Sequence, residues 1–332
     1  MTRSDKIKKL STLLIWHFGA LGDTLFTYPL IYHVKTNYPH IKIVTIGSNS
    51  WSIFKSMDWI DHFFPSHHAW VSSWFGNKKP TMPEPLLETL KAPIAIWAFF
   101  SSPESTLMNN MLSLGAKTIE YCPVKPNRDK PHEFYAKRLL GINNIKVPLL
   151  TINKVYFLSQ RNKTKKINSI LIHPGSGSLA KNIPYDWLRL LIYELESLNI
   201  EPVLIMGPTE EENKTVMSFK YLDVSIKCSQ SLDELVNIIS SFTIFLGADS
   251  GPTHLASLLG LYTMSIFGPT NPKMFSPIGP LGVCYYKPLA CSPCYSCVPL
   301  KNCSGEKPCL RFLKPTMLAK EIAQTLELFA KN

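Results

Sequence analysis

Short apolar runs separated by loops that contain Gly and Pro dominate the first part of the chain. The run Thr12–Phe18 predicts a buried strand, and the loop Gly19–Asp23 follows it. An apolar-periodic segment continues to Val34, and Pro29 within it requires the predicted helix either to kink or to start late. Lys42–Gly47 predicts a second strand. Strand, helix and strand in this order are typical of a parallel α/β sheet.

The rest of this half is less regular. Two apolar runs, Pro93–Phe100 and Thr118–Cys122, predict further strands. Trp51–Pro85 is rich in aromatic residues, Pro and His, and its pattern predicts no particular element. Gln160–Asn168 contains few apolar residues, so we interpret it as a linker between two domains, which agrees with a length of 332 residues.

The second half alternates strands and helices clearly. Ser231-Leu-Asp-Glu234 has the pattern of a capping box, which opens a helix that runs to Ser241. Elements that alternate at this spacing indicate a doubly wound parallel sheet. The predicted strands are Ile170–His173, Pro202–Met206, Thr243–Leu246 and Tyr262–Phe267, and the other predicted helices are Tyr185–Leu198 and Pro252–Leu259.

Composition and charge narrow the class of protein. Hydrophobic residues make up 45% of the chain and charged residues 18%, as in soluble globular proteins. The net charge of +11 favours an acidic partner, namely nucleic acid, an anionic membrane surface or a phosphorylated substrate, although solvated ends and linkers would also account for it. No stretch of about 18 uncharged apolar residues predicts a spanning helix. The N-terminus imitates a secretion signal but lacks a small-residue cleavage site, so we expect a cytoplasmic protein.

Candidate chemistry gathers where predicted strands end. Open parallel sheets bind ligands at the carboxyl ends of their strands. Four such ends carry Gly together with polar or charged residues, and these are Gly19–Asp23, His173–Lys181, Gly207–Glu212 and Gly247–His254.

The segment that begins at Asp249 predicts an anion site at the start of a helix. Pro252 suits a first helical position because it has no N–H to satisfy, and either Asp249 or Ser250 would be the N-cap. The backbone N–H groups of Gly251 and Thr253 would then point out of the positive end of the helix dipole. A well-capped helix without a ligand explains the same residues equally well.

The turn His173–Ser178 contains only small residues after His173 and Pro174, which allows a phosphate to approach the backbone. Lys181 follows within reach and would supply a positive charge. The alternative is a flexible turn with no ligand.

Asp23 has two possible roles. It could be the N-cap of the next helix, or a carboxylate base that projects into a cleft.

These segments together resemble glycosyltransferase family 9, the bacterial heptosyltransferases of lipopolysaccharide core assembly. The resemblance covers nearly the whole chain, from about residue 11 to about residue 327, and it is weakest from Trp51 to Lys166. The residues that carry it are Gly19-Ala-Leu-Gly-Asp-Thr24 with Pro29, His173-Pro-Gly-Ser with Lys181, Met206-Gly-Pro-Thr-Glu-Glu211, Gly247-Ala-Asp-Ser-Gly-Pro-Thr-His-Leu-Ala256 and Phe267-Gly-Pro-Thr-Asn-Pro272.

The resemblance implies a GT-B fold, in which two Rossmann-like domains face each other across a cleft. Residues 1–165 would form the acceptor-side domain, 166–312 the nucleotide-sugar domain, and 313–332 a helix that packs back toward the N-terminal domain. The implied reaction is an inverting, metal-independent transfer of heptose from ADP-heptose to a lipopolysaccharide core or a similar anionic glycolipid. Such an acceptor would bring the cytoplasmic enzyme to the inner membrane, and the resemblance implies no nucleic-acid partner and no required cofactor.

The resemblance also assigns roles to single residues. Asp23 would be the catalytic base, with Gly19 and Gly22 in the acceptor-side loop. Lys181 would contact the donor phosphate, although the family's usual basic residue and Trp after this Lys are replaced here by Asn182 and Ile183. The implied donor-binding residues are Ser176, Lys181, Glu210, Asp249, Ser250, Gly251, Thr253 and His254.

Two alternatives remain open. A nucleotide-sugar epimerase of GT-B form would share the donor site without an acceptor cleft. A zinc-containing nucleic-acid-binding protein would explain the positive charge and the Cys cluster, but it would leave the ordered strand-end motifs unexplained.

Six of the eight cysteines lie between Cys284 and Cys309, in a Pro-rich stretch with almost no helical or strand pattern. Their spacing allows a bound zinc or iron–sulfur centre, disulfides, or packed reduced thiols, and a cytosolic setting disfavours stable disulfides. The candidate ligands of a structural metal are Cys291, Cys294, Cys297, Cys303 and Cys309.

Overall fold

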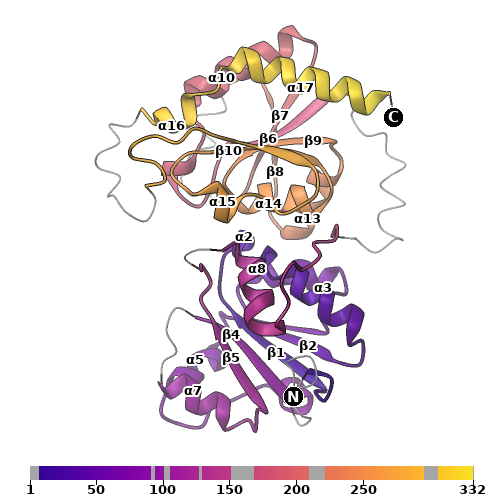
Figure 1. Cartoon of the computed structure of the whole chain (residues 1–332), viewed down its shortest axis with the longest axis vertical. Coiled ribbons are helices and arrows are strands. Elements are labelled where there is room, and N and C mark those ends of the chain that lie inside the picture. Colours follow the sequence, from indigo (N-terminus) through magenta and orange to yellow (C-terminus); the bar gives the residue numbers. More distant parts are fainter. Residues whose placement is uncertain are drawn as a thin grey trace. The chain divides into compact units, whose positions relative to one another are not determined.

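The computed structural model describes residues 7–90, 94–100, 105–126, 129–150, 168–208, 221–294 and 306–331. The chain forms two compact units, Met1–Pro148 and Leu149–Asn332, each with its own sheet (Figure 1). The boundary expected at 165/166 and most of the predicted linker fall outside the described residues.

The first unit contains a five-stranded sheet in which every pair of neighbouring strands is parallel. The strand order is β3-β2-β1-β4-β5, so the first strand lies at the centre. β1 and β4 are buried along their whole length, as their continuous apolar runs predict. The strands are β1 Thr12–His17, β2 Lys42–Gly47, β3 His62–Pro65, β4 Ile94–Phe99 and β5 Thr118–Cys122.

Short helices surround this sheet. The segment after β1 divides into α2 and α3, and Pro29 lies in the first turn of α3, so the second helix starts late rather than kinking. The stretch Trp51–Pro85, whose pattern predicted nothing, contains one strand and three complete short helices. The helices of this unit are α2 Leu21–Leu25, α3 Tyr28–Asn37, η1 Asn49–Trp51, α4 Ser52–Ser56, α5 Ala69–Ser72, η2 Ser73–Phe75, α6 Glu84–Thr89, α7 Ser105–Leu112, α8 Pro131–Tyr135 and the π-helical turn η3 Ala136–Leu140.

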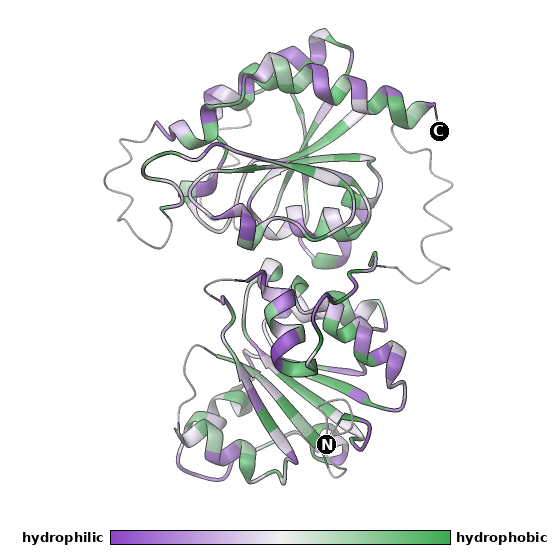
Figure 2. Ribbon diagram, viewed as in Figure 1, coloured by the Kyte–Doolittle hydropathy of each residue, from purple (hydrophilic) through white to green (hydrophobic). Residues whose placement is uncertain are grey.

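The second unit contains a six-stranded sheet in the order β11-β10-β9-β6-β7-β8, again parallel throughout. Its central strands are green in Figure 2, which reflects their apolar sequences. The strands are β6 Ser169–His173, β7 Glu201–Met206, β8 Ser225–Cys228, β9 Ile244–Ala248, β10 Tyr262–Phe267 and β11 Gly282–Tyr286.

The C-terminal helix packs against a helix of this second unit. Figure 1 shows α17 alongside α10, and Trp187 Nε1 of α10 donates to the Leu313 carbonyl 2.7 Å away, just before α17. Leu318 and Ile322 of α17 are fully buried in the core of the unit. The helices are η4 Leu179–Lys181, α10 Tyr185–Ser197, α13 Leu232–Ser240, α14 Gly251–Leu258, α15 Pro272–Phe275, α16 Pro308–Arg311 and α17 Pro315–Ala330.

The strand order of each sheet reverses direction at one point. The loops that leave the sheet at these points carry the candidate site residues. In the second sheet β6 lies between β7 and β9, so the loops that follow β6 and β9 leave the sheet side by side. In the first sheet β1 lies between β2 and β4, and the reversal falls between β1 and β4. Crevices at such reversals are where open α/β sheets bind their ligands.

The predicted fold class, two α/β units with parallel sheets, is therefore confirmed. Among the described residues, no helix combines the length and the apolar character needed to cross a bilayer.

Candidate functional site

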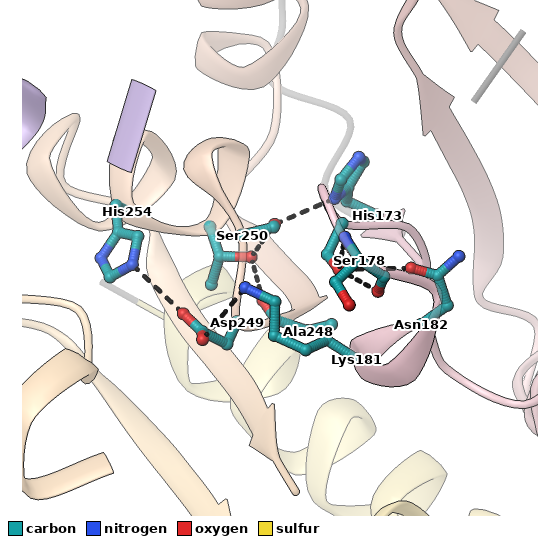
Figure 3. A network of polar contacts seen from close by, with 10 residues as sticks. His173, Ser178, Lys181, Asn182, Ala248, Asp249, Ser250 and His254 are labelled. Atoms are coloured by element: carbon teal, nitrogen blue, oxygen red, sulfur yellow. Dashed lines mark hydrogen bonds and ion pairs between the residues drawn. The ribbon is translucent and has the colours of Figure 1, made fainter. Parts of the chain in front are cut away.

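The loops after β6 and β9 bring three charged or titratable side chains together. Lys181 Nζ lies 3.3 Å from Asp249 Oδ2, and His254 Nε2 lies 3.5 Å from Asp249 Oδ1. Figure 3 shows Asp249 between the other two. Lys181 comes from η4, Asp249 from the end of β9 and His254 from α14, so residues 68 positions apart in the sequence meet at the reversal of the sheet. The structure thus unites three of the residues that the sequence analysis selected.

Asp249 is held in its ionised form. Burial is the largest influence and by itself would raise the pKa of this carboxyl group. The hydrogen bond from His254, the charge of Lys181 and the Thr270 hydroxyl act in the opposite direction and together outweigh burial, so the pKa of Asp249 lies below its ordinary value. The carboxylate therefore fixes Lys181 and His254 without becoming neutral. An ammonium group has three N–H donors, and the contact with Asp249 uses one of those of Lys181.

A one-way chain of hydrogen bonds lies beside this cluster. The Thr253 hydroxyl donates to the Ala248 carbonyl, 2.6 Å away, so it can only accept from Ser250 Oγ at 3.0 Å. Ser250 has then used its proton, so it accepts from His173 Nδ1, also at 3.0 Å. The proton count therefore places a hydrogen on Nδ1 of His173 (Figure 3).

This chain shapes the start of α14. Ser250 is the N-cap residue, but its hydroxyl makes no capping hydrogen bond, because it is directed to Thr253. The first intrahelical bond runs from His254 N to Ser250 O, so the N–H groups of Gly251 and Thr253 precede it. A methyl group on Gly247, the last residue but one of β9, would lie 2.4 Å from the Thr253 hydroxyl, which explains the glycine at this position. The helix start has the geometry of an anion site.

The turn that carries Lys181 is held by its own side chains. The Ser176 hydroxyl donates to Ser178 O at 2.7 Å and accepts from Ser178 N at 3.1 Å, so it closes the turn. Gly177 faces open space, with no heavy atom within 4 Å of where its Cβ would lie. An approaching group would meet backbone at this position rather than a side chain.

Lys307 is a residue that the sequence analysis missed. Its Nζ donates to the carbonyl oxygens of Leu179 at 2.6 Å and Asn182 at 3.2 Å, which bracket Lys181. Four residues further on, Arg311 forms a bidentate ion pair with Asp186 at the start of α10. No sequence motif marks this lysine, because its role depends on carbonyl groups more than 120 residues away.

In the first unit, Asp23 lies in the first turn of α2 and is partly exposed. The N-cap of α2 is Ala20 and that of α3 is Thr27, so Asp23 caps neither helix. Asp23 also raises the pKa of Tyr135, after the larger effect of burial, which shows that the phenol lies near the carboxylate. The capping explanation for this aspartate is therefore wrong.

The loop before Asp23 is fixed by hydrogen bonds to its backbone. Ser48 Oγ donates to the Gly19 carbonyl at 2.6 Å, and Trp51 Nε1 donates to the His17 carbonyl at 3.0 Å. Gly22 belongs to α2, and its carbonyl accepts from Phe26 N. These hydrogen bonds fix the backbone from which the Asp23 side chain extends.

The structure does not describe three of the predicted residues, which are Glu210, Cys297 and Cys303. Cys291, Cys294 and Cys309 form no disulfide, and no group of three or more His, Cys, Asp or Glu in the described part of the chain has the arrangement of a metal site. Cys309 is buried in the core and packs against Gly268. A methyl group placed on Gly268 would lie only 2.8 Å from the Cys309 sulfur.

Comparisons with known proteins identify the family. The model of the family described as glycosyltransferase family 9 (heptosyltransferase) matches residues 137–303. Lipooligosaccharide heptosyltransferase 2 of Campylobacter jejuni is 25% identical over 325 residues, which cover 92% of this chain and 96% of that protein.

Solved structures show the same fold. The Escherichia coli ADP-heptose lipopolysaccharide heptosyltransferase II superposes with a TM-score of 0.71 at 14% identity, over 97% of this chain and 100% of that one. The E. coli heptosyltransferase WaaC with ADP gives 0.64 at 14% identity, over 94% and 99%. The family match spans half of the chain and includes both loops that meet at Asp249. The chain belongs to glycosyltransferase family 9.

Proposed function

We propose that this glycosyltransferase transfers heptose from ADP-heptose to a lipopolysaccharide core, with inversion at the anomeric carbon and without a catalytic metal. The observation that carries the proposal is the Lys181–Asp249 ion pair beside the start of α14. A partly buried lysine and helix N–H groups together suit a diphosphate. A solved relative with the same fold is the E. coli WaaC enzyme in complex with ADP-2-deoxy-2-fluoro heptose, which supports the choice of donor.

The donor would lie against the second unit. Lys181 and the N–H groups of Gly251 and Thr253 would hold the diphosphate and stabilise the charge that it gains on leaving. Asp249 would keep Lys181 in place, and His254 would stand at the sugar side of Asp249. The hydroxyls of Ser176 and Ser250 would shape the two loops, since the structure engages both in internal hydrogen bonds.

The reaction would be a single displacement. The acceptor hydroxyl attacks the anomeric carbon, the bond from that carbon to the phosphate oxygen breaks, and ADP leaves with the bonding electrons. Asp23 takes the proton of the hydroxyl. A single displacement inverts the configuration. Family membership favours this transfer over the epimerase alternative, and the ordered strand-end loops are better explained by a nucleotide sugar than by nucleic acid.

The acceptor and location follow from the same proposal. An acidic glycolipid suits a chain with a net charge of +11, and it would bring the cytoplasmic enzyme to the inner membrane surface without a spanning helix. Vesicles that contain anionic lipid would then bind the enzyme more strongly at low salt than at high salt.

Calorimetry with ADP tests the donor site. Lys181→Ala should raise the Kd for ADP about 10- to 150-fold, the range expected for one lost hydrogen bond to a charged group. Lys320→Ala is the matched control, because Lys320 is exposed on α17. Equal ADP affinity in wild type and Lys181→Ala would remove Lys181 from the donor site and overturn the proposal.

A further inference from the structure

A buried histidine stands next to the proposed base. His17 is the last residue of β1, and its side chain is fully buried. Its ring packs edge-on against Phe99, with centroids 5.0 Å apart, and against Trp51 at 5.7 Å. The side chain has no exposed surface, so His17 does not contact a ligand directly. The proposed mechanism gives this imidazole, packed between aromatic rings, no role.

The protonation of His17 follows from its contacts. The Gly19 N–H donates to His17 Nδ1 at 3.3 Å, so Nδ1 is the acceptor and the hydrogen is on Nε2. Burial lowers the pKa of His17 to about 3, so the ring is neutral at the pH of the cytoplasm. His17 Nε2 makes no hydrogen bond within the described part of the structure, although it is buried. A buried N–H without an acceptor typically costs about 1–3 kcal/mol, so a partner is needed to explain its presence.

The side chain of Asp23 lies on the other side of Gly19 from this imidazole. A methyl group on Gly19 would lie 2.6 Å from His17 Cε1, 3.1 Å from His17 Nε2 and 2.7 Å from Asp23 Cβ. The imidazole and the aspartate side chain therefore flank the same small space, which only glycine leaves empty. Asp23 also raises the pKa of Tyr135, whose hydroxyl donates to the Val124 carbonyl.

We propose that His17 is a positioning residue for Asp23, and that its Nε2–H donates to one carboxylate oxygen when the side chain of Asp23 turns across Gly19. The bond leaves the second oxygen to accept the proton of the acceptor hydroxyl. Since His17 stays neutral, it holds the base in place without competing for that proton. This inference rests on the proposed role of Asp23 as the base.

A matched pair of variants distinguishes the acceptor role of His17 Nδ1 from the proposed donor role of His17 Nε2. His17→Asn retains an acceptor where Nδ1 lies but loses the donor at Nε2, whereas His17→Gln places an amide N–H near Nε2. We expect His17→Asn to lower kcat about tenfold or more with an unchanged KM for ADP-heptose, since one lost hydrogen bond to a charged group is worth about 10- to 150-fold. His17→Gln should recover most of that loss. Equal loss in both variants would show that His17 only packs, and would overturn the inference.

A double-mutant cycle with Asp23→Asn makes the test specific. If His17 acts through Asp23, His17→Asn causes no further loss of turnover in the Asp23→Asn background. The same fold loss in both backgrounds would overturn the His17 inference while leaving the base assignment standing. Full turnover in Asp23→Asn itself would instead overturn the base assignment, and the inference about His17 with it.

Nitrogen-15 NMR of histidine-labelled protein tests the inference even where His17 variants fold poorly. The wild type should show a His17 Nε2–H signal that is protected from exchange with water, and Asp23→Ala should abolish that protection. An equally protected signal in Asp23→Ala would mean that the N–H faces an aromatic ring instead, and would overturn the proposal.

Discussion

Lys307 donates two hydrogen bonds to the turn that carries Lys181, at Leu179 O and Asn182 O. One lysine thereby fixes the backbone from which another lysine reaches Asp249. The contact links the segment before α16 to the loop after β6, so the conformation of the proposed donor site depends on the C-terminal part of the chain.

Replacing Lys307 should weaken donor binding from a distance. Lys307→Met keeps the length of the side chain but removes its N–H donors, so the turn at Lys181 loses two hydrogen bonds. We expect the Kd for ADP to rise roughly three- to tenfold by calorimetry, as for a lost hydrogen bond of ordinary strength. Lys320→Met serves as the control on an exposed helix face. Unchanged affinity in Lys307→Met would show that the turn holds its shape without Lys307.

Asp23→Asn should act on the chemical step alone. Asn has the size of Asp but is not a base, so kcat should fall about 100-fold or more while the KM for the donor barely changes. Steady-state measurement of ADP release with ADP-heptose and a lipopolysaccharide core acceptor gives both constants. Since Asp23 caps no helix, a loss of turnover cannot come from a lost N-cap. Near-normal turnover would refute the assignment.

The lowered pKa of Asp249 predicts how the stability of its loop depends on pH. A carboxyl group whose pKa is lower in the folded state stabilises the fold above its unfolded-state value, near 3.8, and this contribution is lost as pH falls through the folded value. At pH 7, Asp249→Asn should therefore expose the amides of β9 and α14 to faster hydrogen exchange than in wild type. The difference should persist at pH 5 and shrink below about pH 3.8. A difference that grows on acidification would contradict the ion-pair model.

Transfer should persist without divalent metal. Lys181 and the start of α14 carry the charge stabilisation in the proposed mechanism, so dialysis against EDTA should leave kcat within about twofold of its original value. Loss of activity that Mg²⁺ or Mn²⁺ restores would contradict the metal-free mechanism.

The state of the cysteines between Cys284 and Cys309 needs a separate experiment. Elemental analysis of untagged protein measures bound metal, and thiol titration after unfolding counts the reduced cysteines.

Much of the fold could be predicted from the sequence because it depends on local pattern. The predicted strand at Lys42–Gly47 has the bounds observed for β2, and Ser231 caps α13 by accepting from Glu234 N, as its capping box predicts. β8 was missed because its four residues, Ser225–Cys228, are too few and too polar to show a period. β3 was missed as well, because the buried aromatic residues before it, Trp51 and Phe54, show no regular spacing.

The candidate site was only partly predictable. Small residues and charges at strand ends identified Lys181, Asp249 and His254, because parallel strands gather their carboxyl ends at one edge. Lys307 and His17 gave no such signal. Lys307 acts through distant carbonyl groups, and His17 interrupts no pattern, since a histidine at the end of an apolar strand reads as an ordinary core residue.

The proton count along His173, Ser250 and Thr253 has an evolutionary consequence. Both hydroxyl protons are committed to neighbours within the loop, so the helix start itself would offer an anion main-chain N–H groups rather than hydroxyl donors. A point mutation can change a side chain but leaves the N–H of every residue except proline in place. The main-chain part of diphosphate recognition is therefore insulated from sequence drift, whereas Lys181 and the residues around the sugar can each be changed by a single substitution.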